Sequence, residues 1–185
     1  VCLSEGWSEQ LRPLIGESIA VPNPVDAQLK KGVERENFTL LMGRNDPVKG
    51  HKFAFSLGLD DLRVTGVDTA PEGVTALGWV TEEEKWHLLQ TAGSLIVPSE
   101  YEGQPMVILE ALAAGCPVIA SENVPDLPAC VKTAPLGDRD SWNAAIAEPI
   151  TENLEDFISN HLIENVRGLW GEIYDKIIDS NASTE

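Results

Sequence analysis

Short, almost continuously apolar runs recur along the chain and alternate with segments whose apolar residues follow a helical spacing. Such runs indicate strands covered on both faces, because a strand with one solvated face alternates apolar and polar residues. A weaker candidate strand lies at Ser18–Asn23. The clearer candidates are Phe38–Gly43, Leu62–Gly66, Val74–Gly78, Ser94–Ser99 and Pro117–Ser121.

Two of the helical segments carry end signals. Thr81 is a suitable N-cap before three glutamates, Pro105 suits a first helical position, and Gly115 suits a stop. Strand–helix alternation predicts an α/β fold, a Rossmann-like doubly wound parallel sheet with ligands at the carboxyl ends of its strands. The expected helices are 49–59, 82–92, 105–115, 139–148 and a long one from Leu154 to about Ile178.

One connection departs from a regular strand–helix–strand unit. Only the residues VDTAPEG join the runs Leu62–Gly66 and Val74–Gly78. A crossover between parallel strands normally takes a dozen or more residues and usually contains a helix. Either an unusual loop joins these two strands, or one of the two runs is not a strand.

The charge balance narrows the range of partners. The chain has 13 basic and 30 acidic side chains, a formal net charge of −17. This balance argues against nucleic acid as a partner, because phosphate backbones are repelled by an acidic surface. A small anionic ligand would need locally placed cations and backbone N–H groups, and solubility accounts for most of the remaining charge.

Other features of the composition are those of an ordinary globular domain, with 43% hydrophobic residues. Cys2, Cys116 and Cys130 are far apart, which argues against a disulfide framework or a zinc site and for a reducing, cytoplasmic setting. No apolar run is long enough for a transmembrane segment, and the first residues do not show the charged-then-apolar pattern expected of a leader. Because the chain begins with Val1, we expect a fragment of a longer protein.

A carboxylate lies inside the apolar segment that follows Pro105. Glu110 is surrounded by apolar residues, and a buried carboxylate needs partners. Ahead of the segment, Gly103 allows the backbone to approach a ligand closely. A loop that runs into a helix N-terminus at this place is suited to phosphate. The alternative is that Glu110 lies on a narrow solvent-facing stripe, and composition alone favours neither.

Four segments, in this order along the chain, resemble retaining GT4-type glycosyltransferases of the GT-B fold. Glu102 and Glu110 are separated by seven residues, as in the pattern of that family. Any one segment alone would be weak, but four in the same order are specific. The segments are VPNPVD (21–26), LLMGRNDPVKG (40–50), VTALGWVTEEEKWHLLQTAGSLIVPS (74–99) and PSEYEGQPMVILEALAAGCPVIAS (98–121).

The resemblance implies that the chain binds a nucleotide-diphosphate sugar, linked to UDP, GDP or ADP. Arg44 and Lys49 would match the cations that bind the diphosphate and offset the charge that develops on the leaving group. The resemblance implies no cofactor and no metal. The alternatives are a surface salt bridge for Arg44 and a solvated position for Lys49.

The same resemblance assigns the remaining site residues. Glu110 would accept hydrogen bonds from ribose hydroxyls, Glu102 would lie near the donor sugar and take part in catalysis, and the backbone of Val80 would contact the base. Gln104 and Pro105 replace a commoner aromatic residue and glycine of the family. The segment expected to meet the sugar and phosphates comprises Gly103, Gln104, Met106 and Val107.

The implied architecture is the C-terminal half of a GT-B fold. Residues 1–26 would be the end of the first domain and the linker, 27–150 the nucleotide-sugar-binding domain, and 151–185 a C-terminal helical extension. The implied activity is hexosyltransferase-type transfer that retains the anomeric configuration. The N-terminal acceptor domain would act in cis or in trans, so this chain by itself could be inactive.

Two alternatives remain beside transfer. The chain could be a non-catalytic nucleotide-sugar-binding or regulatory module, or a structural domain. We expect a cytoplasmic location. Peripheral association of the full-length protein with a membrane surface is left as an alternative. His51, His87 and His161 are expected at the surface or in packing, with an approach of His51 to a phosphate as the lesser alternative.

Overall fold

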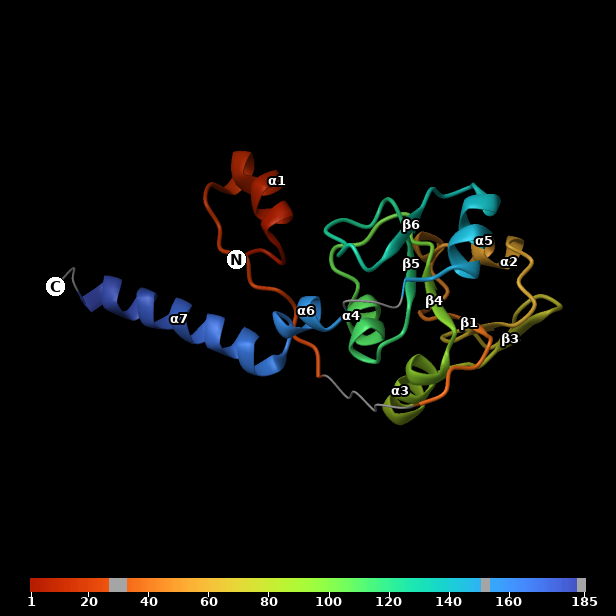
Figure 1. Ribbon diagram of the computed structural model, residues 1–185. Helices are drawn as coiled ribbons and strands as arrows, with labels where there is room; N and C mark the ends of the chain where they lie inside the picture. Colours follow the sequence, from red (N-terminus) through yellow and green to blue (C-terminus); the bar gives the residue numbers. More distant parts are fainter. Residues whose placement is uncertain (27–32, 151–153, 183–185) are drawn as a thin grey trace.

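The computed structural model describes residues 1–26, 33–150 and 154–182. Within them six strands form one all-parallel sheet in the order β3-β2-β1-β4-β5-β6 (Figure 1). This is the predicted Rossmann-like topology, in which the strand order reverses between β1 and β4. The strands are β1 (Thr39–Leu41), β2 (Leu62–Val64), β3 (Val74–Ala76), β4 (Ser94–Val97), β5 (Val118–Ser121) and β6 (Lys132–Ala134).

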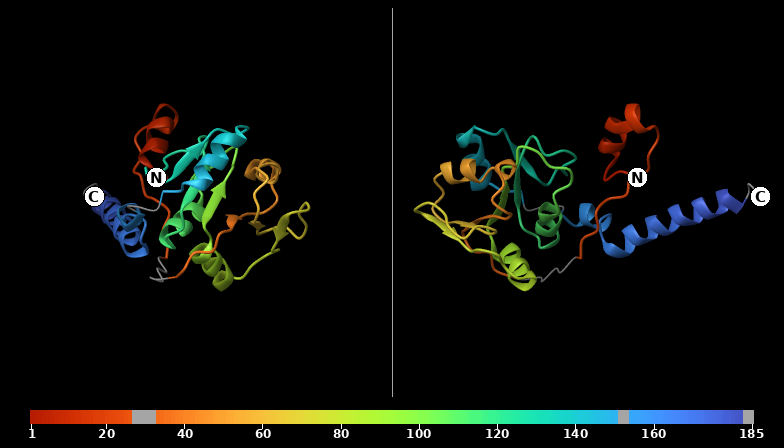
Figure 2. Two further views of the ribbon diagram at one scale, coloured as in Figure 1. Left: turned by 45° about the vertical axis from the view of Figure 1, so that its right-hand side comes forward. Right: turned by 180° about the vertical axis from the view of Figure 1, so that it is seen from behind.

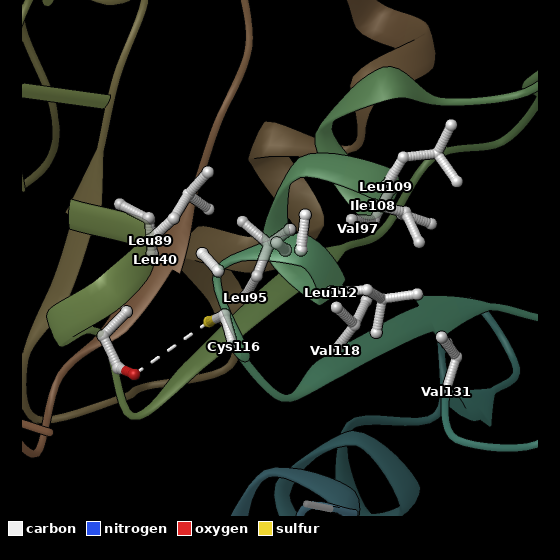
Figure 3. Packing of buried hydrophobic residues seen from close by; sticks show 14 of the residues in the cluster. Leu40, Leu89, Leu95, Val97, Ile108, Leu109, Leu112, Cys116, Val118 and Val131 are labelled. Carbon is white, nitrogen blue, oxygen red and sulfur yellow. Dashed lines mark hydrogen bonds between the residues drawn. The ribbon is translucent and has the colours of Figure 1, made fainter. Parts of the chain in front are cut away.

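Helices cover both faces of the sheet because successive strand residues point to opposite sides. In β4, Leu95 and Val97 belong to the core cluster that contains α3, α4 and α6, whereas Ile96 belongs to the cluster of α2 and α5. Figure 3 shows part of the first cluster, with Leu112 beside the strands. The helices are α1 (Glu5–Ile15), α2 (His51–Ser56), α3 (Glu82–Thr91), α4 (Met106–Ala113), α5 (Arg139–Ala147), α6 (Leu154–Ser159) and α7 (Ile163–Ala182), with the 3₁₀ turn η1 (Pro47–Lys49).

The short connection between β2 and β3 is a loop without a helix, so both candidate strands are real. The two strands pair in parallel, with Leu62 opposite Val74. The loop begins at Gly66, whose φ of +74° suits glycine and whose N–H donates to the carbonyl of Gly78 at 2.7 Å. A Cβ at Gly66 would lie 2.5 Å from the carbonyl oxygen of Gly43, so this position also requires a residue without a side chain.

Several predicted boundaries are wrong in detail. The helix expected at 49–59 is divided into η1 and α2 by Gly50, which has a left-handed φ of +69°. Pro105 precedes α4 as its N-cap instead of occupying the first helical position. Ser18–Asn23 forms no strand of the sheet, only an isolated bridge between Ala20 and Cys2. The helix α1 and the strand β6 were not predicted, and β6 is short and carries a lysine.

The C-terminal segment forms two helices where one was expected. At the break, Leu162 bridges to Val25, and the ring of His161 lies 3.0 Å from the carbonyl oxygen of Asn23. The chain segment before residue 27 therefore binds between α6 and α7. In the view of Figure 1 and in both views of Figure 2, α1 and α7 lie on the same side of the sheet, and α7 extends away from it. The predicted domain limits fall beside 27–32 and 151–153, outside the described residues.

Arg35 links the C-terminal end of α3 to the C-terminal end of α4. Both ends lie on the side of the sheet away from the carboxyl ends of the strands. The guanidinium of Arg35 donates to the carbonyls of Leu89 and Ala92 at the end of α3 and to those of Ala114 and Gly115 after α4. These carbonyls have no partner within their own helices, and a cation also complements the negative end of each helix dipole. One side chain thus fixes the spacing of the two helices.

We predict that Arg35→Met lowers the free energy of unfolding by about 2–3 kcal/mol, because helix-end carbonyls lose their charged donor. Urea denaturation measures the change. Arg139→Met, which removes an exposed arginine at the start of α5, serves as the matched control and should shift stability by less than about 0.5 kcal/mol. Equal effects of the two substitutions would contradict the role of Arg35.

Candidate functional site

A cavity of about 360 Å³ opens at the carboxyl ends of the strands, beside β1 and β4. The chain leaves β1 toward one face of the sheet and β4 toward the other, so no connection covers this point. The cavity walls come from the ends of β1 and β2, the start of α3 and the start of α4. Its lining includes Met42, Gly43, Lys49, Thr65, Gly66, Trp79, Val80, Thr81, Glu82, Lys85, Pro105, Met106, Val107 and Glu110.

The loop after β1 is held against the end of β4 by a close backbone contact. A Cβ at Gly50 would lie 1.9 Å from the carbonyl oxygen of Pro98, which no side chain could tolerate. The side chain of His51 also holds the two ends of this loop together, because its Nε2 lies 3.2 Å from the carbonyl oxygen of Gly43. Lys49 is consequently carried to the cavity on a segment with little freedom.

Lys49 forms an ion pair with the first of the two predicted glutamates. Its Nζ lies 2.7 Å from Oε1 of Glu102, and the hydroxyl of Ser99 donates to the same oxygen at 2.7 Å. Glu102 is 9% exposed, so its charge is largely withdrawn from water and needs both donors. Glu102 itself does not line the cavity and reaches it through Lys49.

The second glutamate, Glu110, has a lysine partner that the sequence did not predict. Nζ of Lys85 lies 2.7 Å from Oε1 of Glu110 and 2.6 Å from Oε1 of Glu82. The side chains of Lys85 and Glu110 are each 18% exposed. Burial is the largest single effect on the pKa of Lys85 and lowers it, but the hydrogen bonds and negative charges of Glu110 and Glu82 together raise the pKa above its ordinary value. Glu110 is therefore a half-buried ion-pair partner at the cavity, not a solvated residue.

The start of α4 presents backbone N–H groups to the cavity. Met106 and Val107 line it and lie in the first helical turn, where N–H groups have no acceptor within the helix. The positive end of the helix dipole faces the same way. This wall of the cavity is suited to an anion.

Another wall of the cavity is formed by the segment before α3. Val80 and Trp79 both line the cavity, and Trp79 is 78% exposed. A capping box fixes the start of α3, because Glu84 N–H donates to Thr81 Oγ1 at 3.3 Å and Thr81 N–H donates to Glu84 Oε2 at 2.7 Å. The predicted N-cap at Thr81 is confirmed.

Besides Glu102, three predicted site residues do not line this cavity. The side chain of Arg44 is 71% exposed and lies 3.5 Å from Oδ2 of Asp46. The carbonyl of Gly103 accepts from the Trp7 indole at 3.1 Å, and Oε1 of Gln104 accepts from the N–H of Asn23 at 2.8 Å. The segment 103–104 thus contacts α1 and the segment after it. The roles of Arg44, Gly103 and Gln104 in ligand binding stay predictions.

Sequence reasoning missed Lys85 and Ser99 as parts of the site. Ser99 lies three residues before Glu102, a spacing that a tight loop after a strand can bring together. Lys85 is distant in sequence from Glu110, and only the packing of α3 against α4 makes them neighbours. The three cysteines are free, as predicted, and burial raises the pKa of Cys116 to about 12.

The fold and the cavity at the strand-order reversal define a Rossmann-like α/β domain with its ligand site at the carboxyl ends of the strands. Residues 34–156 match the family described as "Glycosyl transferases group 1", and the chain belongs to this family. Over 98 residues the chain is 37% identical to the O-antigen chain mannosyltransferase B of Escherichia coli. The aligned residues make up 52% of this chain and 22% of that protein.

Solved structures agree with this fold. A TarM mutant from S. aureus, in complex with fondaparinux, alpha-GlcNAc-glycerol and UDP, superimposes with a TM-score of 0.76 and 14% identity, over 94% of this chain and 43% of TarM. The sucrose-phosphate synthase of Thermosynechococcus elongatus gives a TM-score of 0.77 and 19% identity, over 97% of this chain and 58% of the synthase. The chain thus spans only part of the proteins it matches.

Among the described residues, no helix combines the length and apolarity needed to cross a membrane.

His51, the first residue of α2, is a buried titratable group next to the loop after β1. It is 3% exposed, and its Nδ1 has no hydrogen-bond partner among the described residues. Burial lowers the pKa of His51 below 6.5, the hydrogen bond to Gly43 opposes this shift, and the charge of Lys49 adds to it. The folded state therefore binds the proton less well than the unfolded state.

We predict that His51 contributes stability that is fully present above pH 6.5 and is lost as the pH falls from there toward the lowered pKa of the folded state. Urea denaturation between pH 8 and pH 5 measures the dependence. His51→Gln should flatten the curve in this window, whereas His87→Gln, at an exposed position on α3, should not. Parallel curves for wild type and His51→Gln would disprove the assignment.

Proposed function

We propose that this chain is the donor-binding half of a retaining, GT4-type glycosyltransferase that transfers a hexose from a nucleotide-diphosphate sugar to an acceptor. The single observation that carries the proposal is the cavity beside β1 and β4, where Lys49, the start of α4 and Glu110 converge. Family membership supports the reaction class. The mannosyltransferase relative supports a hexose, and UDP in the TarM complex supports a nucleotide donor.

Each wall of the cavity suits one part of such a donor. The N–H groups of Met106 and Val107 and the charge of Lys49 suit the diphosphate, with Arg44 recruited from the adjacent loop. Glu110 suits the ribose hydroxyls, because a carboxylate accepts several hydrogen bonds. Val80 suits the base, and the exposed indole of Trp79 offers a surface on which a base could stack.

The proposed reaction breaks the bond between the anomeric carbon and the diphosphate oxygen and forms one to the acceptor oxygen. The acceptor hydroxyl passes its proton to the leaving phosphate, whose charge Lys49 and Arg44 offset. Glu102, held by Lys49 and Ser99, would lie beside the donor sugar. The proposal requires neither a metal nor a cofactor.

The acceptor-binding half is proposed to come from another domain, in cis or in trans. The chain spans 22% of the length of the mannosyltransferase it resembles. For the same reason a non-catalytic nucleotide-sugar-binding module is the second candidate. Measuring the length of the parent protein, and then assaying sugar transfer by that protein, separates the two candidates. A thermal-shift screen with UDP-, GDP- and ADP-linked sugars tests the donor site that both require.

We predict that Glu110→Gln weakens nucleotide binding about ten- to a hundredfold, because hydrogen bonds to a charged acceptor contribute about 1.5–3 kcal/mol. The fold should persist, since Lys85 keeps Glu82 as its partner. Isothermal titration calorimetry measures affinity and circular dichroism monitors the fold. Loss of the fold, or unchanged affinity in a folded variant, would assign Glu110 a structural role.

We predict that the double substitution of Arg44→Ala and Lys49→Ala weakens binding of the diphosphate by at least about a hundredfold, because two charged donors are removed. A second double variant, with Arg167→Ala and Lys176→Ala on α7, makes the same change in net charge at exposed positions away from the cavity. It should bind as the wild type does. Equal calorimetric affinities for both variants would refute the diphosphate assignment.

A further inference from the structure

Lys85 is the cation of the cavity that neither the resemblance nor the predicted site residues include. It lies in the first half of α3, it lines the cavity, and its ammonium is within 2.7 Å of Glu110 and 2.6 Å of Glu82. Its backbone N–H donates to the carbonyl of Thr81 at 2.9 Å. The capping box at Thr81 fixes this turn, so the lysine extends from a well-defined position.

A network of contacts around the ammonium limits where it can lie. Glu82 Oε1 also accepts from the indole N–H of Trp86 at 3.1 Å, and the ring of Trp86 lies 5.4 Å from Nζ of Lys85. Trp86 is itself buried in the core. The ammonium is thus held between Glu82, Trp86 and Glu110, and it joins α3 to α4.

This arrangement has two consequences for Glu110. First, Lys85 donates to Oε1 of Glu110 and so sets the rotation of this carboxylate. The second carboxylate oxygen, Oε2, can then accept hydrogen bonds from hydroxyls of a ligand. Second, Lys85 offsets two negative charges on the wall of a cavity that is proposed to take a dianion. Without the lysine, Glu82 and Glu110 would repel the diphosphate of the ligand.

We infer that Lys85 is a positioning residue for ribose recognition: it holds the Glu110 carboxylate in the orientation that ribose hydroxyls require. The inference rests on the proposed function and adds to it a residue that acts through Glu110. If the inference holds, Lys85 affects how strongly the cavity prefers ribose over deoxyribose. A lysine that only linked α3 to α4 would not affect this preference. The raised pKa of Lys85 keeps the ammonium charged throughout the neutral range.

The test compares ribose discrimination in matched variants. Calorimetry measures the affinities for UDP, GDP and ADP and then, for each diphosphate that binds, for its 2′-deoxy and 3′-deoxy counterparts. Lys85→Met, which keeps the aliphatic stem, should reduce the preference for ribose about tenfold. Lys85→Arg should keep most of the preference, because a guanidinium can still donate to both carboxylates. Glu82→Gln should also keep it, because this variant leaves the pair of Lys85 with Glu110 intact.

Thermal denaturation of each variant separates positioning from stability. If Lys85→Met does not fold, Lys85→Gln replaces it as a polar variant of similar length. If the folded variant keeps the full preference for ribose while only its melting temperature falls, Lys85 is structural and the inference is overturned. If wild type binds no nucleoside diphosphate, the proposed function fails and the inference fails with it. If it binds them, an unchanged preference in the variant overturns the inference alone.

Discussion

A carboxylate that is withdrawn from water must be paired with a cation, and this constraint shapes the site. The segment from the end of β4 into α4 carries two such carboxylates, Glu102 and Glu110. Each is held by a lysine from a different part of the chain: Lys49 after β1, and Lys85 on α3. The two ion pairs therefore connect three walls of one cavity through side chains that line or border it.

The sheet places these walls, and the glycines allow them to approach one another. Because β1 and β4 are neighbours whose connections leave on opposite faces, the ends of both strands remain accessible. Gly50 and Gly66 let the backbone of adjacent segments come within distances that exclude any Cβ. At the other end of α3 and α4, Arg35 fixes the spacing of the helices that carry Lys85 and Glu110.

The sequence was sufficient for the strands with continuous apolar runs and for the ends of α3, because burial and capping leave local patterns. It was insufficient for β6, where Lys132–Ala134 has no such pattern, and for the break before α7. That break depends on Val25 and Asn23, which contact Leu162 and His161 from the far end of the chain. Glu110 was recognised as a carboxylate in need of a partner, but its pairing with Lys85 depends on helix packing that no local pattern contains.

The exposed position of Arg44 can be related to the balance of charges in the cavity. Both lysines of the cavity are already paired with carboxylates, so in the proposed function a diphosphate brings more negative charge than Lys49 alone can offset. Arg44 lies on the same loop, is largely exposed, and is 3.5 Å from Asp46. Exposed pairs of this kind contribute about 0–1 kcal/mol, so turning the guanidinium toward an anion costs little. An exposed arginine beside a cavity whose other cations are engaged is therefore compatible with a role that begins when the ligand binds.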